Sequence, residues 1–402
     1  MEKELGIYVH IPFCKKRCSY CDFVSYAGKE DKIGQYFKAL KNEIETYNLK
    51  DYNVTTIYIG GGTPSFVDSK YIKEIIQKIN KGAIELTIEV NPGTITKQKI
   101  EEYKNCGINR LSIGLQSTND NLLKEIGRIH TYNEFLNTYK LAKEAGFENI
   151  NIDLMIGLPN QTIADLKHAI NEIKKLEPKH VSVYSLIVEE GTKIEKQLSS
   201  GELQLPDDEL ERQMYWYVKD QLELLGYEHY EISNFAKKGY KSKHNWNCWE
   251  QKEYIGLGCA AHSYLNGVRY ANTDNLEEYI KQFANIAGVE NIGGVKNSEK
   301  IERPEEIKDL KEIKNFNKCG RIIEEVQSLE DQKNEYMLLG LRKLEGVNIS
   351  AFKAKYIENP LYKYRTQLEK LVKYNLIEIN GNYIRLTNKG LDFANLVWEE
   401  FV

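Results

Sequence analysis

The feature that most constrains the fold is an alternation of short apolar runs with longer amphipathic stretches in the first half of the chain. In the stretch "KIGQYFKALKNEIETY" (32–47), Phe37, Leu40 and Ile44 recur at the spacing of one helix face. Strands joined through helices form parallel sheets with right-handed crossovers. The alternation therefore predicts an α/β fold, an incomplete (β/α)6 barrel with its chemistry at the carboxyl ends of the strands. The six predicted strands are "GIYVHI" (6–11), "TTIYIG" (55–60), "ELTIEV" (85–90), "RLSIGLQ" (110–116), "NINIDLMIG" (149–157) and "HVSVYSLI" (180–187).

The last part of the chain predicts a separate compact unit. Helical patterns near 331–343, 349–356 and 361–373 precede "LIEINGNYIRLT", in which Asn380-Gly381 between two β-like runs indicates a hairpin. Three helices and a hairpin form a winged-helix-like α+β domain. We expect a partial barrel at 1–235 that includes a helix at 208–226, a connecting segment at 236–325, and this domain at 326–402. The lysine-rich stretch 293–320 is expected to be a linker or a peripheral helix.

Composition limits the partners and the location. The formal net charge is −4, and the winged-helix-like unit carries nearly equal numbers of basic and acidic residues, so we expect no nucleic-acid binding. No apolar run approaches the roughly 18 residues of a membrane span, so we do not expect an integral membrane protein. The opening residues show no secretory leader, and seven cysteines with three in one cluster suit a reducing compartment. We expect a cytoplasmic protein.

Three cysteines, Cys14, Cys18 and Cys21, are spaced C-x-x-x-C-x-x-C directly after the first predicted strand. Thiolates select zinc, copper(I) or iron–sulfur clusters. A zinc site would need a fourth ligand, such as His10 or a distant residue. A 4Fe–4S cluster on three cysteines would leave one iron open for a substrate or cofactor, and a site without metal is the third reading. The other cysteines, which are isolated and expected to be small buried apolar residues, are Cys106, Cys248, Cys259 and Cys319.

The spacing resembles the signature of the radical S-adenosylmethionine (SAM) superfamily. That resemblance implies a 4Fe–4S cluster on Cys14, Cys18 and Cys21, whose open iron is chelated by SAM, and a 5′-deoxyadenosyl radical formed by the reduced cluster. The run "GGGTP" (60–64) is similar to the segment that receives the methionyl amino group. Since glycine has no Cβ, its backbone can approach a ligand closely.

A series of motifs narrows the resemblance to the HemN/HemW branch. "YVHIPFC", "GGGTPS", "IEVNPGT", "SIGLQS", "GRIHT" and "DLMIGLP" occur in the order of that branch, which covers residues 7 to about 265. The resemblance implies that the cluster-bound SAM is contacted by Tyr8, Gly61, Gly62, Thr63 and Glu89. It implies a second SAM at Tyr20, Gln116, Arg128, Asp153 and the backbone near Ile187.

Within this branch the chain is most similar to the HemW haem chaperones. The oxidase HemN has a further cysteine two positions after the third, where this chain has Phe23. The resemblance implies haem binding and delivery to acceptors such as respiratory enzymes, with an electron donor for the cluster. The alternative is an oxygen-independent coproporphyrinogen III oxidase of porphyrin biosynthesis, which converts propionates to vinyls.

One further motif bears on haem. "HNWNCW" (244–249) is similar to the H-N-x-x-Y-W of HemW, with Cys248 in place of tyrosine. A histidine imidazole can ligate a haem iron, and aromatic rings can pack against the macrocycle. His244 and Cys248 are therefore the haem candidates, ahead of His262.

Overall fold

A twelve-stranded sheet forms the main part of the molecule in the computed structural model, which describes residues 3–284 and 321–402. Its strands lie in the order β14-β13-β12-β11-β1-β4-β5-β6-β7-β8-β10-β9. The six predicted strands are the parallel strands at its centre, so the α/β prediction is confirmed. They are β1 (Lys3–Ile11), β4 (Tyr52–Gly61), β5 (Glu85–Val90), β6 (Arg110–Gln116), β7 (Asn149–Ile156) and β8 (His180–Ser185).

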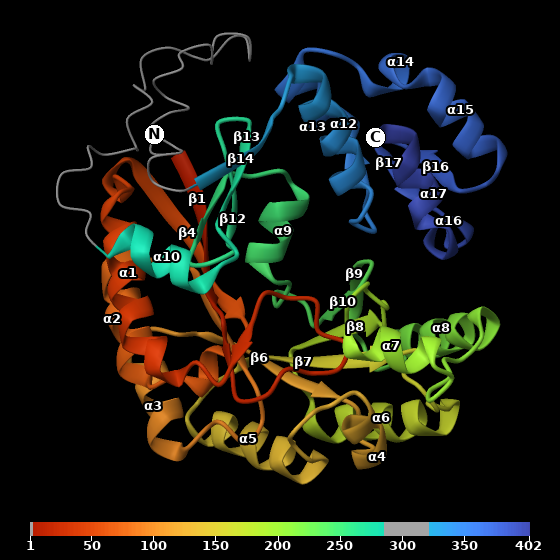
Figure 1. The fold of residues 1–402 in the computed structure, drawn as a ribbon. Helices are drawn as coiled ribbons and strands as arrows, with labels where there is room; N and C mark the ends of the chain where they lie inside the picture. Colours follow the sequence, from red (N-terminus) through yellow and green to blue (C-terminus); the bar gives the residue numbers. More distant parts are fainter. Residues whose placement is uncertain (1–2, 285–320) are drawn as a thin grey trace.

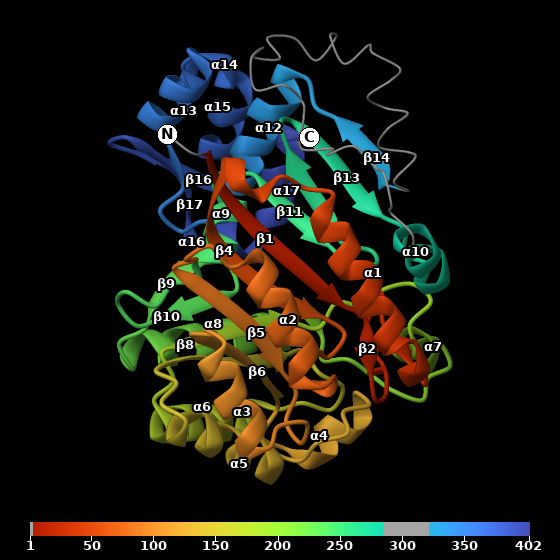
Figure 2. The ribbon, with the colours of Figure 1, turned by 90° about the vertical axis from the view of Figure 1, so that its left-hand side faces the viewer.

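Helices cover the outer face of these strands, and α1, α2 and α3 lie in front of the sheet in Figure 2. Outward residues such as Ile57, Ile88 and Ile113 are fully buried against them. The sheet therefore gains its hydrophobic stabilisation on this side. The helices of the barrel part of the chain, apart from α9, are α1 (Ile33–Glu45), α2 (Ser69–Ile79), α3 (Lys97–Asn105), α4 (Asp120–Glu125), α5 (Tyr132–Glu144), α6 (Ile163–Leu176), α7 (Lys193–Ser199), α8 (Asp208–Leu224) and α10 (Leu276–Phe283).

The inner face of the six strands is polar. Successive side chains of a strand point to opposite faces, and the inward positions are joined by cross-strand hydrogen bonds, for example between Ser112, Asn151 and Asp153. The inward residues include Gly6, Tyr8 and His10 of β1, Thr56, Tyr58 and Gly60 of β4, Glu85, Thr87 and Glu89 of β5, Arg110, Ser112 and Gly114 of β6, Asn149, Asn151, Asp153 and the apolar Met155 of β7, and His180, Ser182 and Tyr184 of β8. Bulky branched residues fill the interior of an ordinary eight-stranded barrel. This lumen instead offers hydrogen-bonding groups.

The sheet is extended at both edges and does not close. Beside β1 lies β11 (Tyr254–Leu257), which is parallel to β1, followed by antiparallel β12 (His262–Leu265), β13 (Val268–Asn272) and β14 (Arg321–Val326). Beside β8 lie β10 (Asn234–Ala236) and β9 (Glu228–Glu231). Much of the expected connecting segment thus contributes strands to the main sheet. The expected linker at 293–320 and Cys319 lie outside the described residues.

The predicted winged-helix-like domain is confirmed. A three-stranded sheet, ordered β15-β17-β16, packs with helices around Met337, Phe352 and Ile384. Asn380-Gly381 forms the hairpin turn, with Gly381 at φ +57°. The third predicted helix is two helices, which meet at Tyr364. The elements are α12 (Leu329–Gly340), β15 (Val347–Asn348), α13 (Ile349–Tyr356), α14 (Pro360–Lys363), α15 (Arg365–Lys373), β16 (Ile377–Asn380), β17 (Tyr383–Leu386), α16 (Asn388–Asp392) and α17 (Ala394–Trp398).

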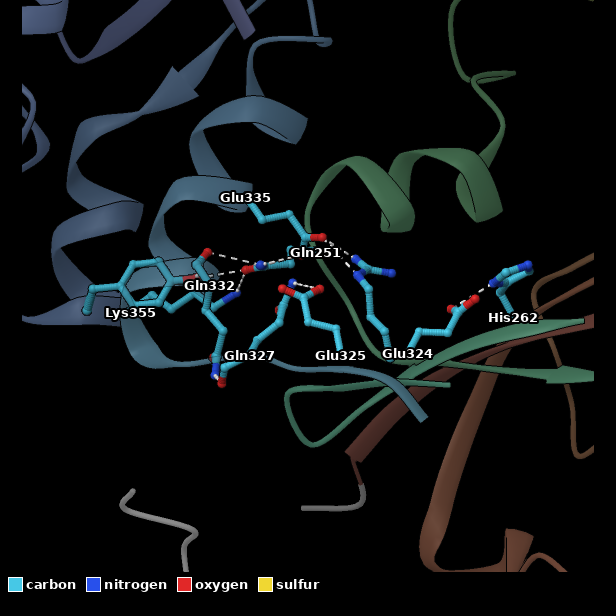
Figure 3. A network of polar contacts seen from close by, with 10 residues as sticks. Gln251, His262, Glu324, Glu325, Gln327, Gln332, Glu335 and Lys355 are labelled. Atoms are coloured by element: carbon cyan, nitrogen blue, oxygen red, sulfur yellow. Dashed lines mark hydrogen bonds and ion pairs between the residues drawn. The ribbon is translucent and has the colours of Figure 1, made fainter. Parts of the chain in front are cut away.

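The C-terminal domain, blue in Figure 1, packs on the barrel through α9 (Lys243–Trp249), which lies between the sheet and α12. Glu335 of α12 accepts hydrogen bonds from Arg269 and Gln251, and Lys355 donates to Gln251 from the other side (Figure 3). Within residues 3–284 and 321–402, no helix combines the length and apolar character needed to cross a bilayer.

Candidate functional site

The three clustered cysteines lie in the loop that follows β1. Cys14 ends the short strand β2 (Phe13–Cys14), which pairs with β3 (Tyr26–Ala27), and is buried, whereas Cys18 and Cys21 are half-buried. Burial raises the pKa of the Cys14 and Cys21 thiols, and the neighbouring thiols raise both further. The three sulfurs therefore share one electrostatic neighbourhood, in which an unligated thiolate is disfavoured and a metal centre would neutralise the charge.

Hydrogen-bond donors reach two of these sulfurs. Thr63 Oγ1 donates to Cys14 Sγ at 3.4 Å, and Arg128 Nη1 donates to Cys18 Sγ at 3.6 Å. Donors and a guanidinium beside a thiol favour the thiolate, which is the form that binds metal. Thr63 follows β4 and Arg128 follows α4, so distant segments of the chain converge on the cysteine loop.

The glycine run after β4 fits closely against this loop. A Cβ atom on Gly62 would lie 3.0 Å from Cys14 Sγ and 3.0 Å from the Ile11 carbonyl oxygen. Gly61 has φ +110°, and a Cβ there would lie 2.6 Å from the His10 ring. Only glycine permits this approach and this backbone conformation. Three soft sulfur donors with an open, side-chain-free backbone beside them fit an iron–sulfur cluster that shares its site with a small ligand.

The zinc reading finds less support. His10 Nε2 donates to the Val24 carbonyl oxygen at 2.8 Å, and its Nδ1 accepts from the Tyr8 hydroxyl at 3.0 Å. Both ring nitrogens are thus engaged, and burial lowers the pKa of His10 to about 4. In the described part of the chain, no three His, Cys, Asp or Glu side chains are grouped as ligands of a single ion. In an iron–sulfur cluster each cysteine binds a different iron, so the three sulfurs need not surround a single ion.

A pair of carboxylates lines the lumen beside the glycine run. Glu89 accepts from the Tyr58 hydroxyl at 3.0 Å and from the Gly61 backbone N–H at 3.2 Å. Burial, with a contribution from Asp153, raises the pKa of Glu89 to about 7. Burial also raises the pKa of Asp153, which accepts from Asn151 at 2.7 Å. The pair can accept hydroxyl or ammonium hydrogens from a ligand.

Arg128 links the cysteine loop to the segment that follows β5 and to β6. Its Nη2 donates to Asn91 Oδ1 at 3.1 Å and to the Gly114 carbonyl oxygen at 3.2 Å. Burial opposes the charge, but Tyr20 and Cys18 outweigh it and raise the pKa of Arg128. A Cβ atom on Gly114 would lie 2.8 Å from Arg128 and 2.9 Å from the Gln116 amide, so glycine is needed for these side chains to meet.

Most residues that the sequence singles out for SAM therefore meet at the carboxyl ends of β1, β4, β5, β6 and β7. Ile187, whose backbone is the predicted contact, lies in the loop after β8, at the same end of the sheet, and its side chain is 69% exposed. The residues that meet are Tyr8, Tyr20, Gly61, Gly62, Thr63, Glu89, Gln116, Arg128 and Asp153.

The two haem candidates, His244 and Cys248, lie on α9. His244 is a buried residue of α9 that faces the lumen, with Nδ1 3.0 Å from Thr56 Oγ1 and its ring 5.4 Å from the Tyr58 ring. Burial lowers the pKa of His244 to about 4 and raises that of Cys248 to about 11. The imidazole is thus neutral and the thiol protonated at neutral pH. His262 is exposed and 2.9 Å from Glu324 Oε2 (Figure 3).

Several lumen residues escaped the sequence analysis. Glu85 accepts from the backbone N–H groups of Lys243 and His244, at 2.9 and 3.0 Å, and so fixes the start of α9. Arg110 and His180 are almost completely buried. Polar residues alternate with apolar ones along β5, β6 and β8, and this alternation could have indicated a polar lumen.

Comparisons with known proteins identify the family of the chain. The Radical SAM superfamily profile matches residues 8–173, and the HemN C-terminal domain profile matches residues 327–393. The haem chaperone HemW of Bacillus subtilis is 36% identical over 98% of both chains. HemW of Lactococcus lactis is 34% identical over 100% of this chain and 98% of its own. The fold matches coproporphyrinogen III oxidase HemN of Escherichia coli with a TM-score of 0.79 and 20% identity, over 100% of this chain and 90% of that one. The chain belongs to the radical SAM superfamily and, within it, to the HemW family.

Proposed function

We propose that the chain is a haem chaperone, which binds haem and delivers it to haem-requiring proteins. The similarity to HemW proteins over the full length of the chain is the observation that carries this proposal. Phe23 supports it, because the cysteine motif ends here on an aromatic residue where the oxidase HemN has another cysteine. The Phe23 side chain is 62% exposed beside the cysteine loop and offers an apolar surface to a macrocycle.

Cys14, Cys18 and Cys21 would hold a 4Fe–4S cluster, and SAM would occupy its open iron. Thr63 and Arg128 support this assignment, since they donate to the Cys14 and Cys18 sulfurs. Such a cluster would supply reducing power to the SAM bound beside it, with an external electron donor to restore it. We expect the proton on Glu89, whose pKa is about 7, to be lost when its carboxylate accepts ligand hydroxyls.

The residues around the cysteines divide into two sets. Tyr8, Gly61, Gly62, Thr63 and Glu89 would contact the cluster-bound SAM. Arg128 and Asp153, with Tyr20, Gln116 and the backbone near Ile187, would contact a second SAM. The retained second set is the observation that favours the alternative function, oxygen-independent coproporphyrinogen III oxidase.

Of the two haem candidates, His244 is the better ligand, because its imidazole is neutral whereas the Cys248 thiol is protonated. Its burial means that α9 must shift before a haem iron can reach it. We expect the protein to act in the cytoplasm, with respiratory enzymes among the acceptors.

An anaerobic haem titration of the cluster-reconstituted chain tests the proposal. Saturable binding with a distinct Soret band is expected, and only weak, unsaturating uptake would contradict a carrier function. His244→Ala should shift the Soret band, while the exposed His262→Ala serves as the matched control.

A second assay separates the chaperone from the oxidase. The reduced chain is incubated with SAM and coproporphyrinogen III, and the products are analysed. Only background conversion is expected, whereas robust formation of protoporphyrinogen would make the oxidase the function of this chain.

A further inference from the structure

The chain leaves α9 through a residue whose backbone conformation normally selects glycine. Gln251 lies just beyond the C-cap of α9 and has φ +53°. Its backbone N–H donates to the Cys248 carbonyl oxygen at 3.0 Å, and the Lys252 N–H donates to the Asn247 carbonyl oxygen at 2.9 Å. These two bonds form a Schellman motif, in which the left-handed residue is usually glycine. A glutamine here is strained, and such strain persists only where the surrounding structure holds the residue.

The side chain of Gln251 makes every hydrogen bond that an amide can make. Its Nε2 donates to the Gln332 carbonyl oxygen at 3.0 Å and to Glu335 Oε2 at 2.7 Å (Figure 3). Its Oε1 accepts from Lys355 Nζ at 2.9 Å and from the Tyr356 hydroxyl at 2.8 Å. An amide has two N–H donors and two acceptor lone pairs, so its capacity is filled. All four partners belong to the C-terminal domain, and Gln251 is 5% exposed between them.

Other contacts between this segment and the C-terminal domain are less directional. The Arg342 guanidinium lies 4.5 Å from the centre of the Trp249 ring, and Lys343 Nζ is 4.0 Å from Glu250 Oε1. Within residues 3–284 and 321–402, Trp249 Nε1 and Arg342 Nε are buried without a hydrogen-bond partner. Because unpaired buried donors weaken an interface, the directional attachment of α9 to this domain rests on Gln251.

The other end of α9 is attached to the barrel. Glu85 accepts from the backbone N–H groups at the start of the helix, and His244 Nδ1 lies 3.0 Å from Thr56 Oγ1. The helix spans only residues 243–249, so its two attachments act on one short rigid unit. Release of the end at Gln251 therefore loosens the packing of His244 in the lumen.

We propose that Gln251 is a positioning residue whose amide anchors the end of α9 to the C-terminal domain and so keeps His244 and Cys248 buried. Through this anchor the domain controls whether α9 can move away from the lumen. The anchor is tested with neither haem nor SAM. Only its consequence, the access of haem to His244, rests on the proposed function.

Amide hydrogen exchange of the cluster-reconstituted full chain tests the anchor. Gln251→Gly relieves the backbone strain but removes the four side-chain bonds. The amides of residues 243–249 should therefore exchange at least about tenfold faster than in the unaltered chain. This exchange should be nearly independent of low urea concentrations, since opening of α9 alone exposes little surface, whereas β6 amides should follow global unfolding and speed up with urea.

α15 supplies a matched control. Asn375 has φ +57°, its N–H donates to the Val372 carbonyl oxygen, and the Leu376 N–H donates to the Leu371 carbonyl oxygen, each at 2.9 Å. Its exposed side chain makes no hydrogen bond in the described part of the chain. Asn375→Gly thus relieves the same kind of strain without breaking a side-chain bond, and it should leave the exchange of α9 unchanged.

Two results would overturn the anchor. In Gln251→Gly, α9 amides could exchange as slowly as in the unaltered chain, or they could follow the β6 amides in their dependence on urea. Either result would leave Gln251 a merely structural residue. If Gln251→Gly fails to fold, Lys355→Met removes one of the bonds from the other domain and should speed up α9 exchange by less; no acceleration would count against the anchor.

Haem association, followed at the Soret band, separates this inference from the proposed function. Gln251→Gly should take up haem faster than the unaltered chain, because α9 moves more readily. Equal rates alongside faster hydrogen exchange would overturn the control of haem access. A chain that binds haem in neither form would contradict the proposed function, while the exchange result would still decide the anchor.

Discussion

Glu335 joins the C-terminal domain to the barrel, and its removal is predicted to weaken that attachment strongly. Its carboxylate accepts from Arg269 Nε at 2.9 Å, from Arg269 Nη2 at 2.5 Å and from Gln251 Nε2 at 2.7 Å. The side chains of Glu335 and Arg269 are only 18% and 24% exposed. Glu335→Ala would therefore leave the guanidinium half-buried with its bonds to the carboxylate lost.

The expected cost follows from these contacts. A hydrogen bond to a charged group contributes about 1.5–3 kcal/mol when it is buried. Because the pair retains some contact with solvent, which screens it, we expect the three bonds together to stabilise the fold by about 2–4 kcal/mol. The control is Glu378→Gln in the hairpin, where Glu378 and Arg385 are 46% and 40% exposed. An exposed pair of this kind contributes below about 1 kcal/mol.

Tryptophan fluorescence during urea unfolding suits this measurement. All four tryptophans lie where the two domains meet: Trp216 donates to Asp392, Trp246 is 5.0 Å from Lys343, and Trp249 and Trp398 flank Arg342. Glu335→Ala should shift the fluorescence transition to lower urea. A free energy of unfolding within about 0.5 kcal/mol of the unaltered chain, a typical surface effect, would refute the reasoning.

Three further predictions concern the site. Cys18→Ala should remove most of the iron and the visible absorbance of anaerobically purified protein, whereas Cys106→Ala should retain both; equal iron in the two variants would contradict the cluster assignment. Gly62→Ala should cost about 1–3 kcal/mol in unfolding free energy, as overpacking does, and lower the iron content, because its Cβ would meet the Cys14 sulfur. His244 has a folded pKa of about 4, below its ordinary 6.5, so stability falls as the pH drops from 6.5 toward 4. Between pH 7 and 5 the unaltered chain should lose about 2 kcal/mol more than His244→Asn, and equal losses would show that His244 is not buried in its neutral form.

The sequence predicted the elements whose signals are local. The limits of β5 and β6 match their apolar runs residue for residue, and Asn380-Gly381 turns as its dipeptide indicates. β11 and β12 have four residues each and pair with distant strands, so no local pattern marked them. Cysteine spacing predicted the loop, but the approach of Thr63 and Arg128 to the sulfurs depends on tertiary folding. The sequence does mark the start of α14, because Asn359 is its N-cap and Pro360 its first residue. That start could have indicated that the third predicted C-terminal helix is divided.

The place of β1 in the sheet has a consequence for how the protein is made. β1 occurs early in the chain but lies in the interior of the sheet, between β4 and β11. A ribosome completes β4 at residue 61, but β11 begins only at residue 254, so one edge of β1 stays open through most of synthesis. Open edges invite pairing with other chains, and pairings between distant segments form slowly. The cysteine loop follows β1, so we expect its geometry to mature only after residue 257 has emerged, and any cofactor that this loop holds to bind late in synthesis.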